Sequence, residues 1–457
     1  MTVVHHTVVH HTAAESDAEL HLRLAGEGLL VDHPGEDGGA WESPLDAAAH
    51  ALVAVGALPA ATAQTIVDDY YLARSCRSGE DSSFRWHRRM AQYGPAGPGP
   101  ANLGRFRALT SGQLIEQPWG NLLIDYVVFS ADATVLHVTM RPSAALGGRF
   151  GRVSPHALHR GVSLHGAGGH MIGPGVPGQL TLTDDQGTSV TAGFSGGGTD
   201  TEWTGEFEAR PGLALNTAWI DVLGERIELV DEPGGGIEVW LEPVAEPDPG
   251  RRYLQARLAV LLSAHEDAPL DSTIDALVAV GALGADDPAI AEARAVLRQH
   301  AHGRPGHGGP GPAGSGLAEP WRSLLAARGR GPRPGPAGRV MVGAVTPPFG
   351  GLTVAVLALR STEEELIADV ELSPGMPHWH AGLTRVDEPM LAWWAVDDRG
   401  GYYLGQPSSW NSGPDRAAGQ IEFWPALDPA ATRLDIMPTT LSERAVIRIP
   451  LSWAAAR

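Results

Sequence analysis

An eight-residue sequence, ALVAVGAL, occurs twice in this chain, at 51–58 and again at 276–283. The match extends upstream, where PLDAAAH precedes the first copy and PLDSTID precedes the second. In both copies apolar residues recur at helical spacing and a glycine follows near the end, which is typical of a helix that stops at glycine or contacts another helix closely. Because a second helical pattern follows each copy, we expect helical hairpins at 41–93 and 251–300.

The segments that follow the two hairpins also correspond. QPWGNLLIDYVVFS from Gln117 matches PPFGGLTVAVLALR from Pro347, and LTLTDDQG matches WWAVDDRG, which pairs Asp184 with Asp397. Apolar residues alternate or form short bounded runs here, as in strands, and the Asp-Gly sequences indicate turns. The pattern resembles immunoglobulin-like sandwiches. We therefore predict a mainly β chain with minor α structure, in which internal duplication produced two tandem β-sandwich modules, each preceded by an αα-hairpin.

The predicted segments follow one another along the 457 residues, of which 58 are glycine and 36 proline. Such a composition favours turns and linkers. In order, they are an N-terminal segment that is partly disordered or an edge strand (1–40), hairpin 1 (41–93), a Gly/Pro linker (94–105), sandwich 1 (106–245), hairpin 2 (251–300), a Gly/Pro-rich linker (301–338) and sandwich 2 (339–457). Within the second linker, LAEPWRSLLAAR indicates a short helix.

Charge and composition exclude several classes of function. The sequence contains no lysine, so P-loop and Schiff-base chemistry are excluded, and its single cysteine rules out an intrachain disulfide. The formal net charge of −20 argues against nucleic acid or an anionic membrane as partner. No apolar run approaches the ~20 residues of a membrane span, and the first residues lack the pattern of a secretory signal. We expect a cytoplasmic protein whose partner is another protein.

Two motifs have the residues of hydrolase sites. GFSGG at 193–197 matches the serine-hydrolase pattern with Ser195 as nucleophile, but loop and strand residues follow it where a helix is required. The stretch PHALHRGVSLHGAGGH contains histidines that can gather a metal ion: His156, His159, His165 and His170. It contains no cysteine and no carboxylate. We expect no metal and no catalytic residue, and His156, His165 and His170 are the first candidates if a metal binds.

Aromatic residues concentrate in the second module. Adjacent side chains of a strand face opposite sides of the sheet, so one residue of each neighbouring pair should point away from the core. The predicted binding face comprises Trp393, Trp394, Tyr402, Tyr403 and Trp410. Outward aromatic rings of this kind bind sugars or proteins, unless the helical hairpin or the other module covers them.

These observations predict a non-enzymatic binding, scaffold or adaptor protein without a cofactor, in which two related modules present binding surfaces. Two alternatives stay open. One is a hydrolase that uses the histidine cluster or Ser195, and the other is carbohydrate binding by the aromatic residues of the second module.

Overall fold

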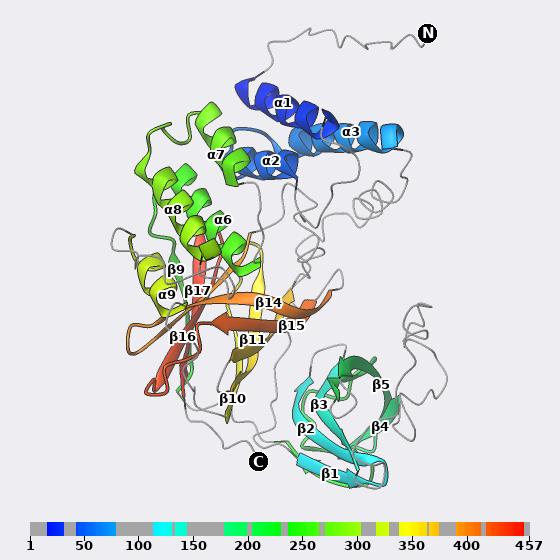
Figure 1. The fold of residues 1–457 in the computed structure, drawn as a ribbon. Helices are drawn as coiled ribbons and strands as arrows, with labels where there is room; N and C mark the ends of the chain where they lie inside the picture. Colours follow the sequence, from blue (N-terminus) through cyan, green and yellow to red (C-terminus); the bar gives the residue numbers. More distant parts are fainter. Residues whose placement is uncertain are drawn as a thin grey trace.

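The computed structural model describes residues 16–31, 43–78, 113–129, 133–143, 178–198, 203–229, 236–264, 270–302, 317–328, 338–362, 365–373, 390–412 and 417–451. Within these ranges the chain is mainly β. The helices gather at one end of the molecule, beside one of two antiparallel sheets (Figure 1). None of the helices in the described ranges is both long and apolar enough to cross a membrane.

The helices are α1 (Asp17–Val31), α2 (Pro44–Ala54), α3 (Ala60–Ser78), α6 (Pro249–Ala264), α7 (Leu270–Ala279), α8 (Pro288–His302) and α9 (Trp321–Arg328). The repeated octapeptide forms the end of α2 and of α7. Gly56 and Gly281 stop these helices with φ of 72° and 69°, a conformation that glycine adopts without steric cost. The predicted glycine stops are therefore confirmed in both copies.

Helices from the two halves of the chain share one core. α2 packs directly on α7, and eight consecutive residues of α2 from Leu45 to Leu52 are buried. The same apolar cluster continues through α6, α8 and α9 to Leu404 of the second sheet. The helical hairpins are thus halves of a common bundle, because neither apolar face is covered by its own hairpin alone.

The first sheet comprises β1 (Gln113–Gln117), β2 (Gly120–Phe129), β3 (Thr134–Pro142), β4 (Gln179–Asp184), β5 (Ser189–Gly198), β6 (Trp203–Ala209), β7 (Trp219–Val222) and β8 (Glu225–Glu228). Its strands lie in the order β1-β2-β3-β6-β5-β4-β7-β8, and all neighbours pair antiparallel. Inward-facing residues such as Leu122, Phe194 and Phe207 fill its core.

The second sheet comprises β10 (Gly338–Val345), β11 (Thr353–Ser361), β12 (Leu366–Ser373), β13 (Ala392–Asp397), β14 (Tyr402–Ser412), β15 (Ala417–Trp424), β16 (Arg433–Thr439), β17 (Glu443–Pro450) and β9 (Glu238–Pro243). Its order, β10-β11-β12-β15-β14-β13-β16-β17-β9, repeats that of the first sheet strand for strand. The second sheet has one additional strand, β9, which precedes α6 in the sequence and pairs with β17.

Each sheet is one continuous hydrogen-bonded sheet that curls strongly and nearly closes on itself (Figure 1). A sandwich requires two separate sheets packed face to face. The predicted mainly β character is confirmed, whereas the sandwich architecture and its immunoglobulin-like form are not. Apolar alternation along a strand shows which face is buried but does not show how the strands close around the core.

The outer faces of the two sheets pack on each other. Tyr126, Val128 and Val135 of the first sheet form an apolar cluster with Ala355 and Leu357 of β11. Beside this cluster, charged side chains from both sheets meet. Arg339 forms ion pairs with Asp125 and with Asp369, and its guanidinium lies 5.0 Å from the ring centroid of Tyr126. The two sheets are therefore joined by apolar and ionic contacts.

Two segments contain more regular structure than their sequences predict. Helix α1 lies inside 1–40, which was expected to be partly disordered or an edge strand, and it packs on α2 and α3. In the predicted linker at 301–338, the expected short helix is present as α9. This part of the segment is not a flexible linker, because Leu317, Trp321 and Leu324 are buried in the helical core. The linker predicted at 94–105 lies outside the described residues.

Candidate functional site

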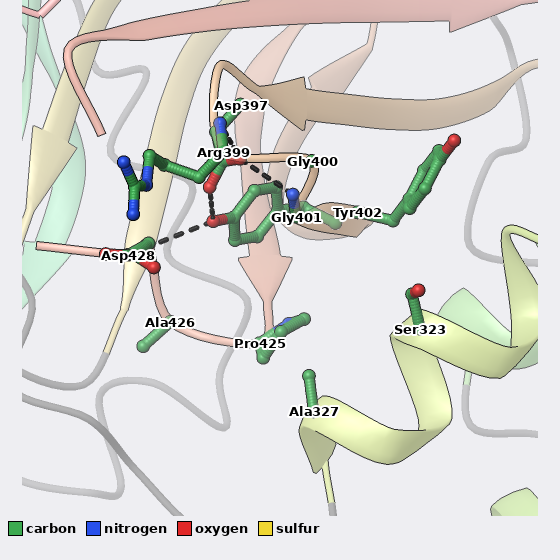
Figure 2. Close-up of a pocket in the computed structure, with 11 residues that line it drawn as sticks. Ser323, Ala327, Asp397, Arg399, Gly400, Gly401, Tyr402, Pro425, Ala426 and Asp428 are labelled. Atoms are coloured by element: carbon green, nitrogen blue, oxygen red, sulfur yellow. Dashed lines mark hydrogen bonds between the residues drawn. The ribbon is translucent and has the colours of Figure 1, made fainter. Parts of the chain in front are cut away.

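A pocket of about 230 Å³ lies between α9 and one end of the second sheet (Figure 2). Ser323 and Ala327 of α9 form one side. The turn between β13 and β14 and the loop after β15 form the remainder of the lining: Asp397, Arg399, Gly400, Gly401, Tyr402, Tyr403, Pro425, Ala426 and Asp428. The helix predicted within the linker thus contributes a wall of this pocket.

Asp397 holds the β13–β14 turn together. Its Oδ1 accepts the backbone N–H groups of Arg399 at 2.9 Å and of Gly401 at 2.7 Å. A carboxylate that caps two N–H groups in this way satisfies donors that the tight turn leaves without strand partners. Gly400, at φ 81°, supplies the left-handed conformation that the turn requires.

Tyr403 links this turn to the opposite loop. Its hydroxyl donates to Oδ2 of Asp397 at 2.5 Å and accepts the backbone N–H of Asp428 at 3.1 Å (Figure 2). Burial, followed by the hydrogen bond to Asp397, raises the pKa of Tyr403 above its ordinary value. The phenol therefore stays protonated and acts as a donor throughout the neutral range.

Close packing explains the glycine at position 401. A Cβ atom there would lie 2.7 Å from Oδ2 of Asp397 and 3.0 Å from the hydroxyl of Tyr403. Contacts this short are not tolerated without displacement of the bonded pair. Gly401 therefore makes room for the Asp397–Tyr403 hydrogen bond.

The first sheet contains the same turn at the corresponding place. Oδ1 of Asp184 accepts the N–H groups of Gln186 at 3.0 Å and Thr188 at 2.7 Å. The following aspartate also has the same role in both sheets. Asp185 accepts the N–H of Ala218, as Asp398 accepts that of Thr432. The paired aspartates are thus structural elements of the turns.

The two turns differ in the hydrogen bonds that their other side chains form. In the first sheet, Gln186 donates to Asn216 across the turn at 3.3 Å. In the second sheet Arg399 and Ala430 stand at these positions, and alanine offers no acceptor. The Arg399 side chain is exposed and forms no hydrogen bond or ion pair with any described residue. Within the described ranges, its guanidinium therefore has no polar partner.

Two further differences affect the same pocket. Ala214 and Ser189 of the first sheet correspond to Asp428 and Tyr402 of the second. Oδ1 of Asp428 accepts the N–H of Ala430 at 2.9 Å, which leaves Oδ2 without a hydrogen bond to the described part of the chain. Tyr402 is half-buried, and its ring points away from the other labelled residues that line the pocket (Figure 2).

The structure separates the residues of the predicted binding face. Trp393 and Tyr403 are 1% and 2% exposed and lie in the core of the second sheet. Trp394 faces the other way, as the alternation requires, but α9 covers it, and its ring lies 5.1 Å from that of Trp321. The side chain of Trp410 lies outside the described residues. Tyr402 and Tyr403 are the members of this set that line the pocket.

Of the predicted hydrolase residues, the structure describes Ser195, which does not line this pocket. Ser195 lies within β5, in register with Glu206 of β6, so no helix follows it as a nucleophile elbow requires. His156, His159, His165 and His170 fall outside the described residues. Over the ranges that are described, no three His, Cys, Asp or Glu side chains gather in a way that could hold a metal ion.

Arg399 and Asp428 were not predicted from the sequence. Neither belongs to a recognisable motif, because a lone arginine or aspartate beside a turn is common. The aligned sequences of the two turns nevertheless contain a signal that marks these positions. The two Asp-Asp turns match at their structural positions and differ at the positions that face the pocket: Gln186 against Arg399 and Ala214 against Asp428.

Comparisons with known proteins identify no family for this chain. No protein-family model matches it, and no curated protein matches its sequence. Among solved structures, the chain is similar to one described as the crystal structure of the conserved domain protein from Bacillus anthracis. That similarity has 8% sequence identity and a TM-score of 0.17, and it covers 74% of this chain and 81% of that chain. A likeness this low supports no argument about fold or function.

Proposed function

We propose that this protein is a non-enzymatic binding protein of the cytoplasm, a scaffold in which the pocket beside α9 contacts the ligand. The supporting observation is the contrast between the two Asp-Asp turns. In the first sheet Gln186 is bonded across the turn, whereas in the second Arg399 and Asp428 face a pocket with unused hydrogen-bonding capacity. Unpaired polar groups around a concave site are typical of ligand recognition.

The chemistry of the pocket favours binding over catalysis. Asp397 accepts three hydrogen bonds that hold the turn, and Tyr403, with its raised pKa, donates one of them. No histidine or cysteine occurs among the described residues that line the pocket. A general base requires a group that can release and accept a proton near neutral pH. The hydrogen bonds of Asp397 and Tyr403 instead hold the turn in place.

We further propose that the two halves arose by internal duplication and that the ligand contact belongs to the second copy. The matching strand order and the matching turns at Asp184 and Asp397 support this origin. Contacts between the sheets, including the Arg339–Asp125 ion pair, support a scaffold of fixed geometry. We expect the natural partner to be a protein that presents the ligand group to the pocket.

The test replaces the pocket residues by their counterparts from the first sheet. The triple variant Arg399→Gln, Tyr402→Ser, Asp428→Ala contains side chains that the same kind of turn already accommodates at Gln186, Ser189 and Ala214. Binding of immobilised peptide and glycan panels is measured for the full-length wild type and the variant. We expect a ligand that the wild type retains and the variant loses.

The matched control is Gln186→Arg, which adds the same cation to the first sheet and should leave binding unchanged. Equal binding by the wild type and the triple variant would count against this site. Labelling of Ser195 by a fluorophosphonate, or stoichiometric zinc that is lost when His165 and His170 are replaced, would support a hydrolase instead.

A further inference from the structure

Helix α1 has an exposed face that carries two leucines, at the outer end of the helical bundle (Figure 1). Side chains on this face recur at spacings of three, four and three residues, which places them on one side of the helix. They form the α1 stripe: Asp17, Leu20, Leu24 and Glu27. Leu20 and Leu24 are 48% and 57% exposed. Apolar side chains exposed at helical spacing and bordered by charge are typical of a helix that binds another protein segment.

The corresponding helix of the second half is covered by a sheet. Helix α6 precedes the second copy of the repeat as α1 precedes the first, and it packs against β13 and β14. Its leucines are at most 3% exposed: Leu254, Leu258, Leu261 and Leu262. They share a core with Ala392 and Leu404 of those two strands. Helix α1 packs on α2, α3 and α7, and no described strand packs against it as β13 and β14 pack against α6.

The first sheet does not have a surface suited to the α1 stripe. In the second sheet, the side chains that join the helical core are apolar: Ala392, Trp394 and Leu404. Their counterparts in the first sheet are polar and exposed: Gln179, Thr181 and Thr191. A polar surface gains little from packing on leucines, because polar groups that lose water without a new partner cost free energy. The first sheet is therefore not the partner of the α1 stripe.

Charge distinguishes the remaining occupants. Asp17 and Glu27 lie at the two ends of the stripe, and neither forms an ion pair with a described residue. A second copy of the stripe would bring like charges together, and an anionic lipid surface would be repelled as well. Residues 1–15 of the same chain contain no arginine or lysine to pair with the two carboxylates. A segment with an apolar face and a basic border complements both the leucines and the carboxylates.

We infer that the α1 stripe docks a basic amphipathic helix of a partner protein. Apolar side chains of the partner, spaced at three and four residues, pack on Leu20 and Leu24. Arginine or lysine side chains at the border of that apolar face pair with Asp17 and Glu27. This surface is separate from the pocket beside α9, so the inference is tested independently of the pocket.

The experiment titrates fluorescently labelled helical peptides, about as long as α1, with the full-length protein and measures fluorescence anisotropy. The first peptide has a leucine face bordered by lysine and arginine. The second has the same leucines with glutamate at the basic positions, and the third is a scrambled form of the first without an apolar face. We expect the first peptide alone to bind, with an affinity that falls as salt is added.

Variants of the α1 stripe separate the apolar contribution from the charge contribution. Leu20→Gln and Leu24→Gln should each weaken binding of the basic peptide about tenfold or more, because each removes a leucine that the peptide buries. The matched control is Leu114→Gln, since Leu114 is 51% exposed but lies on β1. Asp17→Asn combined with Glu27→Arg should transfer the preference to the acidic peptide. Circular dichroism should show the same helix content for every variant.

Other results would overturn the inference. Equal affinity for the three peptides, or binding of none of them, would show that the stripe selects no basic helix. A dimer that replaces peptide binding and dissociates in Leu24→Gln, measured by sedimentation, would identify a second copy as the occupant. Peptide binding that appears only after Val8→Ser and Val9→Ser would identify the N-terminal residues of this chain as the occupant.

Discussion

The hydroxyl of Tyr403 donates a 2.5 Å hydrogen bond to Oδ2 of Asp397 and, through its oxygen, also holds the backbone N–H of Asp428. One phenol therefore joins the β13–β14 turn to the loop after β15. In the first sheet Val190 stands at the corresponding position, and Oδ2 of Asp184 is buried without a partner in the described residues. A pocket wall of the second sheet thus depends on a contact that the first sheet lacks.

Removal of this hydroxyl should destabilise the protein. In Tyr403→Phe the ring still fills the core, but Oδ2 of Asp397 and the N–H of Asp428 lose their partner. The expected cost is about 1–3 kcal/mol in the free energy of unfolding, measured by urea denaturation. Tyr402→Phe is the control, because the hydroxyl of Tyr402 bonds to none of the described residues. Equal unfolding midpoints for the two variants would contradict the linking role of Tyr403.

Gly401 and Tyr403 should be energetically coupled. Gly401→Ala places a Cβ against Asp397 and the Tyr403 hydroxyl, so we expect it to destabilise by more than about 1 kcal/mol. In the Tyr403→Val background, which reproduces the valine of the first sheet, the same substitution should cost less. A double-mutant cycle from thermal or chemical unfolding measures the coupling. Simple additivity of the two substitutions would show that the close contact does not restrict position 401.

Tyr253 should make the protein sensitive to alkali. It is buried in α6, its hydroxyl has no partner in the described chain, and burial raises its pKa above the ordinary value of about 10. Because the folded state binds this proton more tightly than the unfolded state, its contribution is complete below about pH 10 and is lost as the pH rises further. Denaturation at about pH 8 and about pH 11 should show a smaller loss of stability for Tyr253→Phe than for the wild type. At neutral pH this variant should be at least as stable, since no hydrogen bond is removed.

Arg339 should be required to hold the two sheets together. Arg339→Met leaves the carboxylates of Asp125 and Asp369 without their shared cation at a largely buried contact. We expect a loss of about 3–5 kcal/mol and a larger radius of gyration in small-angle scattering. Arg226→Met is the matched control. Arg226 also lies over an aromatic ring, at 4.4 Å from Trp219, and pairs with Glu228, but it is 56% exposed and should contribute less than about 1 kcal/mol. Equal effects of the two substitutions would argue against a fixed arrangement of the sheets.

The helical parts show what local patterns can and cannot predict. Gly56 and Gly281 were correctly predicted as helix stops, because the signal lies within one turn. Helix α1 was missed, partly because Gly26 interrupts its sequence. In the structure a Cβ at position 26 would lie 2.4 Å from the ring of Tyr70, so the glycine permits the close packing of α1 on α3. A residue that weakens a helix in isolation is here required by a distant side chain.

The β parts were predicted at the level of strands and turns. The alternation at Trp393 and Trp394 correctly indicated opposite faces. It did not show that α9 covers one of them, since the docking of a short helix depends on side chains from the whole bundle. The site escaped prediction for the same reason. Arg399 and Asp428 become neighbours through tertiary structure, and only the comparison of the two turns marked them as different.

Strand β9 has a consequence for any attempt to divide the chain. It follows the first sheet in the sequence, yet its register with β17 runs from Glu238 opposite Arg448 to Pro243 opposite Glu443, and Arg444 also pairs with Glu242. A recombinant second half that began at α6 would expose the hydrogen-bonding edge of β17. Open edges of this kind recruit strands from other molecules and promote aggregation. The second half should therefore stay monomeric only when it is expressed from before Glu238.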